Sequence, residues 1–235
     1  MTMIADKLQA VRARVSTACT TAGRGVDAVQ LLAVSKTCGV PAIEDAVAAG
    51  QTMFGENYIQ EAVEKIRALH HRAVQWHCIG PVQSNKTRLV AEHFDWVHSV
   101  DRLKIAQRLS EQRPAHSPPL QICIQVNTDG GANKAGVDPR ELGALARAVA
   151  QLPNLKLRGL MTIPEPAPDF AASLALHGRA KALFDALNAD GLALDTLSMG
   201  MSADLEAAIQ AGSTMVRVGT AIFGARPRLQ QAQVG

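Results

Sequence analysis

The sequence predicts a single α/β domain, a (β/α)8 barrel of the TIM type with one extra helix at its start. Three observations lead to this fold class. The chain has 235 residues, a length within the range that one such barrel needs. Short apolar segments alternate with helical segments along the whole chain, as they do in parallel α/β folds. No change in composition and no flexible linker divides the chain, so we expect residues 1–235 to form one domain.

Eight short segments have the character of parallel strands. Such strands are buried on both faces, so most of them are continuous apolar runs. The predicted strands are 30–35, 51–54, 75–79, 96–100, 121–127, 156–162, 196–199 and 215–218. Eight strands, each followed by a helix except at a ragged C-terminal end, match the number that closes a TIM barrel.

The segments between these strands have the spacing of surface helices. In 41–49, Pro41 stands at a first helical position and Gly50 directly follows the last one, which are typical start and stop signals. The other predicted helices are 58–69, 85–93, 101–112, 139–151, 170–189 and 203–211, and residues 1–21 form the extra leading helix.

An open, doubly wound sheet would also alternate strands with helices. That fold favours a glycine-rich turn after the first strand, where it binds a dinucleotide. Residues 34–39 (Val-Ser-Lys-Thr-Cys-Gly) do not form such a turn. The closed barrel is therefore the leading prediction.

Composition limits the class of protein. A hydrophobic fraction of 47 % with a charged fraction of 19 % is typical of a soluble globular chain. The net charge of +3 gives no reason to expect nucleic acid or a membrane surface as partner. No apolar run approaches the ~20 residues of a membrane-spanning helix, and the N-terminal segment lacks the apolar core of a signal peptide. Four widely spaced cysteines indicate neither a zinc site nor a disulfide framework, so we expect a cytoplasmic protein without metal.

One lysine stands where barrel enzymes place reactive groups. Lys36 directly follows an apolar strand, and functional side chains of barrels come from the C-terminal ends of strands. Apolar neighbours would favour the neutral, nucleophilic amine. A solvated surface lysine at a strand end is the alternative interpretation, and the position alone does not decide between them.

The last two loops have the features of a phosphate-binding site. Gly200 lets the backbone approach a ligand closely, and Ser202 is placed to cap the helix that follows. The eighth strand ends in Gly219-Thr220, so both loops lie after strands seven and eight, where barrels frequently bind phosphate. Backbone N–H groups and the hydroxyls of Ser202 and Thr220 can hold a dianion there. Ordinary glycine turns and helix caps are the alternative.

Arg217 is predicted to point into the barrel from the last strand. It lies two residues before Gly219, so the two share a face. A buried guanidinium needs an acceptor. A ring nitrogen of a cofactor would serve, and a salt bridge to Glu or Asp is the alternative. Met199 is the methionine placed to touch such a ring, whereas the other methionines are expected to fill gaps in the barrel.

Six stretches resemble one protein family over nearly the whole chain. They are Ala33–Thr37, Phe54–Glu61, Trp76–Lys86, Gly159–Thr162, Ser198–Ser202 and Arg217–Gly224. The motifs Gly-Glu-Asn-Tyr and Ser-Met-Gly-Met-Ser are the most specific of these. The family is that of the pyridoxal phosphate homeostasis proteins, also called the proline synthase co-transcribed group.

The resemblance implies a fold-type III barrel, like the N-terminal domain of alanine racemase, that holds pyridoxal 5′-phosphate (PLP). Lys36 would carry the cofactor as a Schiff base, Ser202, Gly219 and Thr220 would hold its phosphate, and Arg217 would face the pyridine nitrogen. Asn57, His77 and Met161 would line the pocket at strand ends. Lys134 matches a family lysine that handles PLP in transit. The chain would be a monomer or weak dimer with PLP and PLP-dependent apoenzymes as partners.

Two departures from the family pattern concern this transfer. Cys38 stands where members often carry a second lysine, and the loop 128–132 is shorter and richer in glycine than usual. A transfer mechanism that needs a lysine beside Lys36 is therefore in doubt.

The sequence favours a carrier over an enzyme. A guanidinium only donates hydrogen bonds, so Arg217 would leave the pyridine nitrogen unprotonated and the ring a poor electron sink. Racemases of this fold use a tyrosine from a second domain, and Tyr58 is the only tyrosine here. We therefore expect vitamin B6 homeostasis with little or no turnover and no catalytic residue. A weak amino-acid racemase or lyase is the second hypothesis, and a sugar-phosphate barrel enzyme without PLP is the third.

Overall fold

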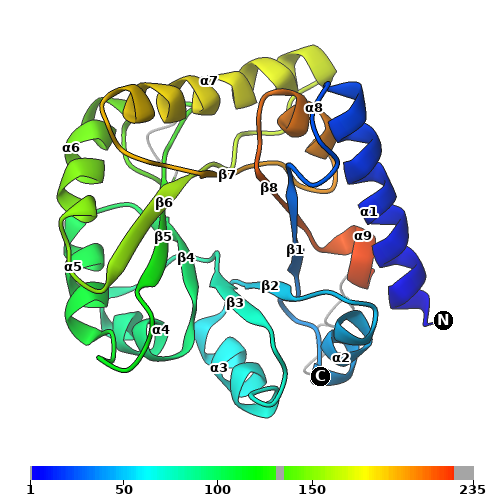
Figure 1. Cartoon of the computed structure of the whole chain (residues 1–235), viewed down its shortest axis with the longest axis horizontal. Helices are drawn as coiled ribbons and strands as arrows, with labels where there is room; N and C mark the ends of the chain where they lie inside the picture. The colour runs from blue at the N-terminus through cyan, green and yellow to red at the C-terminus, as the bar shows by residue number, and fades with distance from the viewer. Residues whose placement is uncertain (1, 131–134, 225–235) are drawn as a thin grey trace, which may run out of the picture.

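The computed structural model describes residues 2–130 and 135–224 and shows a closed barrel of eight parallel strands. Neighbours in sequence are neighbours in the barrel, and the last strand pairs with the first (Figure 1). The strands are β1 (Gln30–Val34), β2 (Met53–Glu56), β3 (Gln75–Cys78), β4 (Trp96–Val100), β5 (Leu120–Gln125), β6 (Leu155–Met161), β7 (Thr196–Ser198) and β8 (Met215–Val218). The predicted fold class is confirmed.

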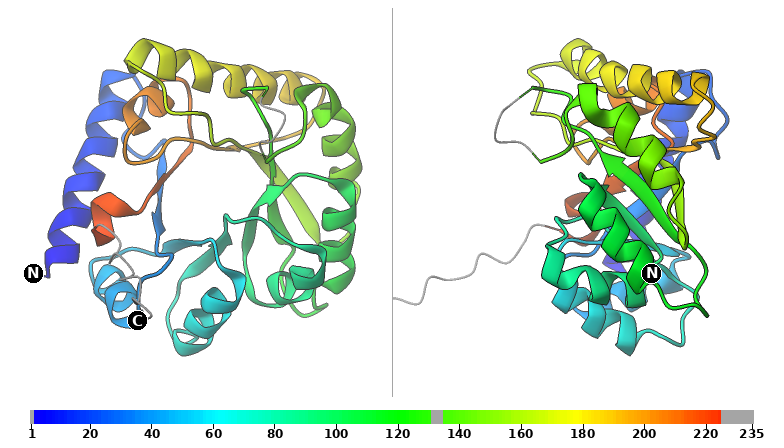
Figure 2. Two further views of the ribbon diagram at one scale, coloured as in Figure 1. Left: turned by 180° about the vertical axis from the view of Figure 1, so that it is seen from behind. Right: turned by 90° about the vertical axis from the view of Figure 1, so that its left-hand side faces the viewer.

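Helices follow the strands and form the outer ring (Figures 1 and 2). Their bounds are α1 (Met3–Thr21), α2 (Val40–Ala48), α3 (Ile59–Ala68), η1 (Ser84–Lys86) with α4 (Thr87–His93), α5 (Leu103–Gln112), α6 (Pro139–Ala150), α7 (Phe170–Ala189), α8 (Leu205–Gln210) and α9 (Thr220–Phe223). Within the described residues, none of these helices has the length and apolar character needed to span a bilayer.

The leading helix α1 covers the side of the barrel where the last helix is short. Thr2 caps it by accepting a hydrogen bond from Ala5 N–H at 3.3 Å. Its buried side chains recur every three or four residues: Leu8, Val11, Val15, Ala18 and Cys19. This face packs against α2, α8 and α9, and α9 itself has only four residues (Figure 1). The helix thus supplies apolar cover that α9 is too short to give.

The core has an outer and an inner part because side chains alternate along each strand. On β1, Leu31 and Ala33 belong to the large cluster that packs under the helices, whereas Leu32 and Val34 belong to a separate cluster with Ile79. A third small cluster consists of Trp96, Cys123 and Met161. The strands are therefore buried on both faces, which is why they read as apolar runs.

Several predicted helices begin later than expected, and α5, for example, starts at Leu103 instead of residue 101. Residues 84–86 form a turn of 3₁₀-helix before α4 starts at Thr87. The helix after β7 starts at Leu205 rather than at residue 203, with Asp204 at its N-cap position. Ser202 is therefore not a helix cap, and the prediction of that role was wrong. The difference matters because it leaves Ser202 in the loop that borders the candidate site.

Candidate functional site

A cavity of about 540 Å³ lies at the C-terminal ends of the strands. Small-molecule sites in proteins have volumes of roughly 300–1,000 Å³. Residues at or just after the ends of β1, β2, β3, β6, β7 and β8 line it. Six of the predicted cofactor residues are among them: Lys36, Asn57, Ser202, Arg217, Gly219 and Thr220. Lys36 and Thr220, which are 184 residues apart in the chain (36 to 220), therefore meet at one mouth of the barrel.

A tight turn carries Lys36 to this cavity. The turn follows β1 and is closed by a hydrogen bond from Cys38 N–H to Ser35 O at 3.0 Å. Lys36 and Thr37 are its two central residues, and Thr37 has a φ of 64°. Cys38, the residue that departs from the family pattern, also lines the cavity.

The loops after β7 and β8 leave backbone donors available. The N–H groups of Ser202, Ala203 and Thr220 donate no hydrogen bond to another group in the described part of the chain. Two contacts of Asp204 hold the loop after β7 in place. Asp204 accepts a hydrogen bond from Met201 N–H at 2.6 Å, and it contacts His177 Nε2 at 2.9 Å. Donors held in a fixed place suit an anion such as phosphate.

Gly200 shows why glycine is required between β7 and this loop. Its φ is 94°, and an added Cβ would stand 2.5 Å from the Cβ of Ala208. Its carbonyl accepts a hydrogen bond from Arg217 N–H at 2.9 Å. Gly200 thus ties the loop after β7 to β8 at the position of the arginine.

The guanidinium of Arg217 is buried beside the cavity without a carboxylate partner in the described residues. Its Nη1 donates to the carbonyl and hydroxyl oxygens of Ser198 at 2.7 and 2.8 Å, and its Nη2 donates to Thr162 O at 2.8 Å. Burial lowers the pKa of Arg217 to about 10, which leaves it charged at neutral pH. The predicted inward direction is therefore correct, but carbonyl and hydroxyl groups replace the salt bridge that was the alternative.

A chain of buried polar groups continues from Arg217 across the barrel. Ser198 Oγ lies 3.0 Å from His98 Nδ1, and His98 Nε2 lies 3.0 Å from His77 Nδ1. The ring of His77 stacks on Trp96 with ring centroids 5.2 Å apart. Burial lowers the pKa of His77 to about 3 and lowers the pKa of His98 as well. Both imidazoles are therefore neutral at physiological pH.

Three predicted cofactor residues are not among those that line the cavity. His77, Met161 and Met199 are completely buried. Met161 packs with Trp96 and Cys123 inside the barrel, and Met199 belongs to the large core cluster. Met201, two residues further along, lines the cavity and has an exposed fraction of 39 %. Lys134 lies outside the described residues.

The two buried histidines predict a loss of stability in acid. A histidine with a lowered pKa in the folded state takes up its proton more readily when the chain is unfolded. Unfolding is therefore favoured as the pH falls below 6.5, the pKa of a histidine in the unfolded chain, because both His77 and His98 have lowered pKa values in the folded state. We expect the free energy of unfolding to fall between pH 7.5 and pH 5.5 in urea titrations.

The variant His77→Asn isolates the contribution of one ring. Asparagine keeps a hydrogen-bonding group close to the position of Nδ1, so the contact with His98 can survive, but it does not titrate. We expect a smaller loss of stability with acid in the variant than in the wild type. Equal pH dependence in the two proteins would contradict the assignment.

A buried ion-pair cluster behind the Lys36 turn was not foreseen. Lys65 Nζ contacts Glu56 Oε1 at 2.8 Å and also contacts Glu61 of the same helix. Glu56 accepts a further hydrogen bond from Ser35 Oγ at 2.6 Å. Burial raises the pKa of Glu56, while Lys65 and Ser35 oppose that shift. The i,i+4 spacing of Glu61 and Lys65 was the only sign of this cluster in the sequence.

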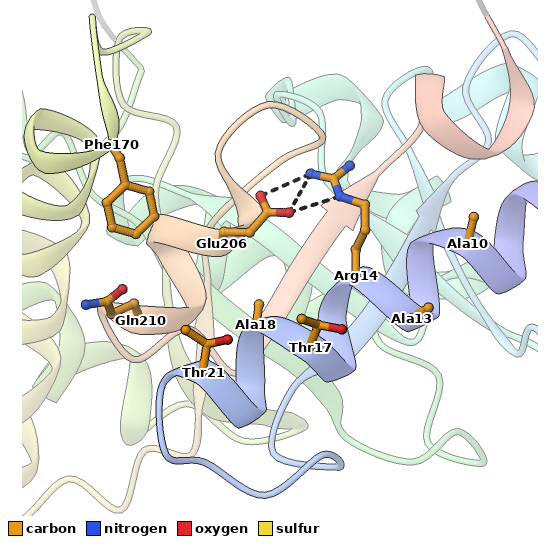
Figure 3. Close-up of a pocket in the computed structure, with 9 residues that line it drawn as sticks. All are labelled: Ala10, Ala13, Arg14, Thr17, Ala18, Thr21, Phe170, Glu206 and Gln210. Atoms are coloured by element: carbon orange, nitrogen blue, oxygen red, sulfur yellow. Dashed lines mark hydrogen bonds and ion pairs between the residues drawn. The ribbon is translucent and has the colours of Figure 1, made fainter.

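A second hollow, of about 360 Å³, lies on the outside of the barrel between α1, α7 and α8 (Figure 3). Its walls are small residues of α1 together with Phe170 and Gln210. An exposed ion pair joins Arg14 and Glu206 across it at 2.8 Å (Figure 3). Because its walls include no lysine, cysteine or histidine, the cavity at the strand ends is the better candidate for covalent chemistry.

Comparison with known proteins identifies close relatives. The model of the alanine racemase N-terminal domain family matches residues 7–227. The "Pyridoxal phosphate homeostasis protein" of Vibrio cholerae is 57 % identical over 230 residues, covering 96 % of this chain and 98 % of that protein. The protein of the same name from Pseudomonas aeruginosa is 59 % identical over 226 residues, covering 96 % and 97 %.

Solved structures with the same fold include one with PLP. PipY of Synechococcus elongatus PCC7942, solved with PLP bound, is 39 % identical and has a TM-score of 0.83, covering 94 % of this chain and 100 % of that one. The alanine racemase of Bacillus anthracis has a TM-score of 0.69 at 19 % identity, covering 94 % of this chain and 57 % of that one. The racemase likeness shows the fold alone.

Proposed function

This chain belongs to the family of pyridoxal phosphate homeostasis proteins, and from that premise we propose that it binds PLP in the cavity at the strand ends. Lys36 is the covalent anchor in this proposal. The protein holds the cofactor with little or no turnover and serves the supply of PLP to apoenzymes in the cytoplasm. The observation that carries the proposal is the meeting of Lys36, the donors after β7 and β8, and Arg217 around one cavity.

The residues of the cavity fit each part of the cofactor. The amine of Lys36 suits the aldehyde carbon. The free backbone donors, with the hydroxyls of Ser202 and Thr220, suit the phosphate. Arg217 supplies a fixed hydrogen-bond donor for an acceptor atom such as the ring nitrogen. PLP, when bound, supplies an aldehyde for covalent attachment and a ring that can accept electrons.

The groups around the cavity favour storage over catalysis. Arg217 cannot give up a proton to the ring nitrogen at neutral pH, because its pKa is about 10 even when buried. Tyr58, the only tyrosine of the chain, is not among the cavity residues and has an exposed fraction of 52 %. The described residues therefore offer no tyrosine opposite Lys36 for a second proton transfer.

Equilibrium dialysis with PLP, and with pyridoxal as the matched ligand without phosphate, tests the binding mode. Several charge-assisted hydrogen bonds to the phosphate should make PLP bind at least about 100-fold more tightly than pyridoxal. Similar affinities for the two ligands would mean that the loops do not hold the phosphate. Absence of PLP binding would overturn the proposal and favour a sugar-phosphate ligand.

The alternative of a weak racemase or lyase has its own readout. An enzyme of that class must labilise the Cα hydrogen of its amino acid. In deuterated water with the PLP-loaded protein, we expect alanine and serine to exchange this hydrogen no faster than with free PLP. Faster exchange that disappears in Lys36→Ala would establish turnover.

A further inference from the structure

The turn that carries Lys36 contains a residue in a costly backbone conformation. Thr37 has a φ of 64°, in the left-handed region that β-branched residues rarely adopt. It occupies the third position of the turn closed by Cys38 N–H and Ser35 O, where a positive φ usually calls for glycine or asparagine. Such a conformation persists only where the surrounding structure holds it.

Helix α3 contacts the backbone on both sides of Lys36. Glu61 Oε1 accepts a hydrogen bond from Thr37 N–H at 2.8 Å. Lys65 Nζ donates to Ser35 O at 3.0 Å. The two residues lie one helical turn apart and are themselves ion-paired. Together they fix the peptide groups before and after the lysine.

The contact of α3 with the Lys36 turn is supported by a buried ion pair. The Lys65 side chain has an exposed fraction of only 6 %, and Glu56, which is completely buried, pairs with it at 2.8 Å. The Glu61 side chain, in contrast, is 34 % exposed. Removal of Glu61 would leave the Lys65–Glu56 ion pair in the interior, and this pair has no net charge. The fold should therefore tolerate the change.

We propose that Glu61, held in place by Lys65, is a positioning residue that keeps Thr37 in its left-handed conformation and so directs Lys36 into the cavity. The inference rests on the proposed function, because it concerns the presentation of the covalent anchor. Glu61 is not among the residues that line the cavity, so its effect on cofactor uptake acts through the backbone of Thr37.

A double-mutant cycle tests this link between Glu61 and Thr37. The proteins are the wild type, Glu61→Ala, Thr37→Gly and the double variant. Glycine adopts a positive φ without cost, so the turn no longer needs Glu61 when residue 37 is glycine. Glu64→Ala is the matched control, because Glu64 is an exposed glutamate of the same helix without a recorded ion pair among the described residues.

The readouts are the dissociation constant for PLP, the amount of PLP fixed by borohydride at a set time, and the thermal midpoint of the cofactor-free protein. In the threonine background we expect Glu61→Ala to weaken PLP binding about tenfold. In the Thr37→Gly background, Glu61→Ala should weaken PLP binding by less than about threefold, since glycine adopts the positive φ without strain. Glu64→Ala should bind like the wild type.

Two results would overturn the inference. One is an affinity in Glu61→Ala equal to that of the wild type. The other is an equal loss in both backgrounds, which would show that Glu61 acts independently of Thr37. Failure of the proposed function looks different, because the wild type itself would then bind no PLP, or would bind it equally well after Lys36→Ala.

Discussion

Replacement of Lys36 by alanine is expected to weaken PLP binding by at least about 100-fold, because the covalent bond to the cofactor is lost. The variant should also lack the absorbance beyond about 400 nm that an imine of PLP gives. Residual affinity should remain, since Arg217, Gly219 and Thr220 still line the cavity. The measurements are equilibrium dialysis and an absorbance titration of the purified protein.

Lys104→Ala serves as the control for this prediction. Lys104 is an exposed lysine of α5 and is not among the cavity residues. It should leave both the affinity and the spectrum unchanged. If Lys36→Ala kept the spectrum of the wild type, another lysine would have to be the anchor.

The second large effect concerns closure of the barrel at Gly159. A Cβ on this residue would stand 1.7 Å from the backbone oxygen of Thr196, its neighbour on β7. On the other side Gly159 pairs with Cys123 of β5, directly after a shift of register. Because backbone atoms on both sides fix the site, the clash has no side chain that could move away. We expect Gly159→Ala to cost at least about 4 kcal/mol of unfolding free energy, or to prevent folding.

The same substitution at another glycine, Gly178→Ala, is expected to have the opposite effect on the unfolding free energy. Gly178 lies inside α7, and an added Cβ would meet no atom within 4 Å. Alanine there should raise the unfolding free energy by about 0.5–1 kcal/mol, since glycine is unfavourable in a helix interior. Urea denaturation followed by circular dichroism measures both variants. Equal stability of the two variants would contradict the packing described for Gly159.

The sequence allowed prediction of the architecture because local patterns determine it. Most strands are apolar runs of limited length, and several helices between them have clear start signals, such as Pro139 at the start of α6 and Asp169 at the N-cap of α7. The strands 96–100 and 215–218 agree with the structure to the residue. Ends governed by contacts elsewhere were less accurate: α8 starts at Leu205 because Asp204 is engaged by Met201 N–H and His177.

The site was predictable only in part, for a physical reason. Residues next to strand ends, such as Lys36 and Thr220, can be placed from the sequence because barrel topology brings all strand ends together. Which of two nearby residues faces the cavity depends on loop conformation. The positive φ of Gly200, between Met199 and Met201, is such a case.

Contacts between distant segments carry no local signal in the sequence. His77 and His98 lie on neighbouring strands, and both are buried and hydrogen-bonded to each other, although nothing in the sequence pairs these two among its seven histidines. The contact of Glu61 with the backbone of Thr37 spans 24 positions. Only the folded structure shows that these groups support the residues of the cavity.

The central claim is that Lys36 anchors PLP, and one measurement tests it most directly. The purified protein is loaded with PLP, reduced with borohydride and digested, and the modified peptide is identified by mass spectrometry. The account predicts one pyridoxyl phosphate group per chain, carried by Lys36, and loss of the absorbance beyond about 400 nm on reduction. A group on a different lysine, or no group on any peptide, would contradict the account.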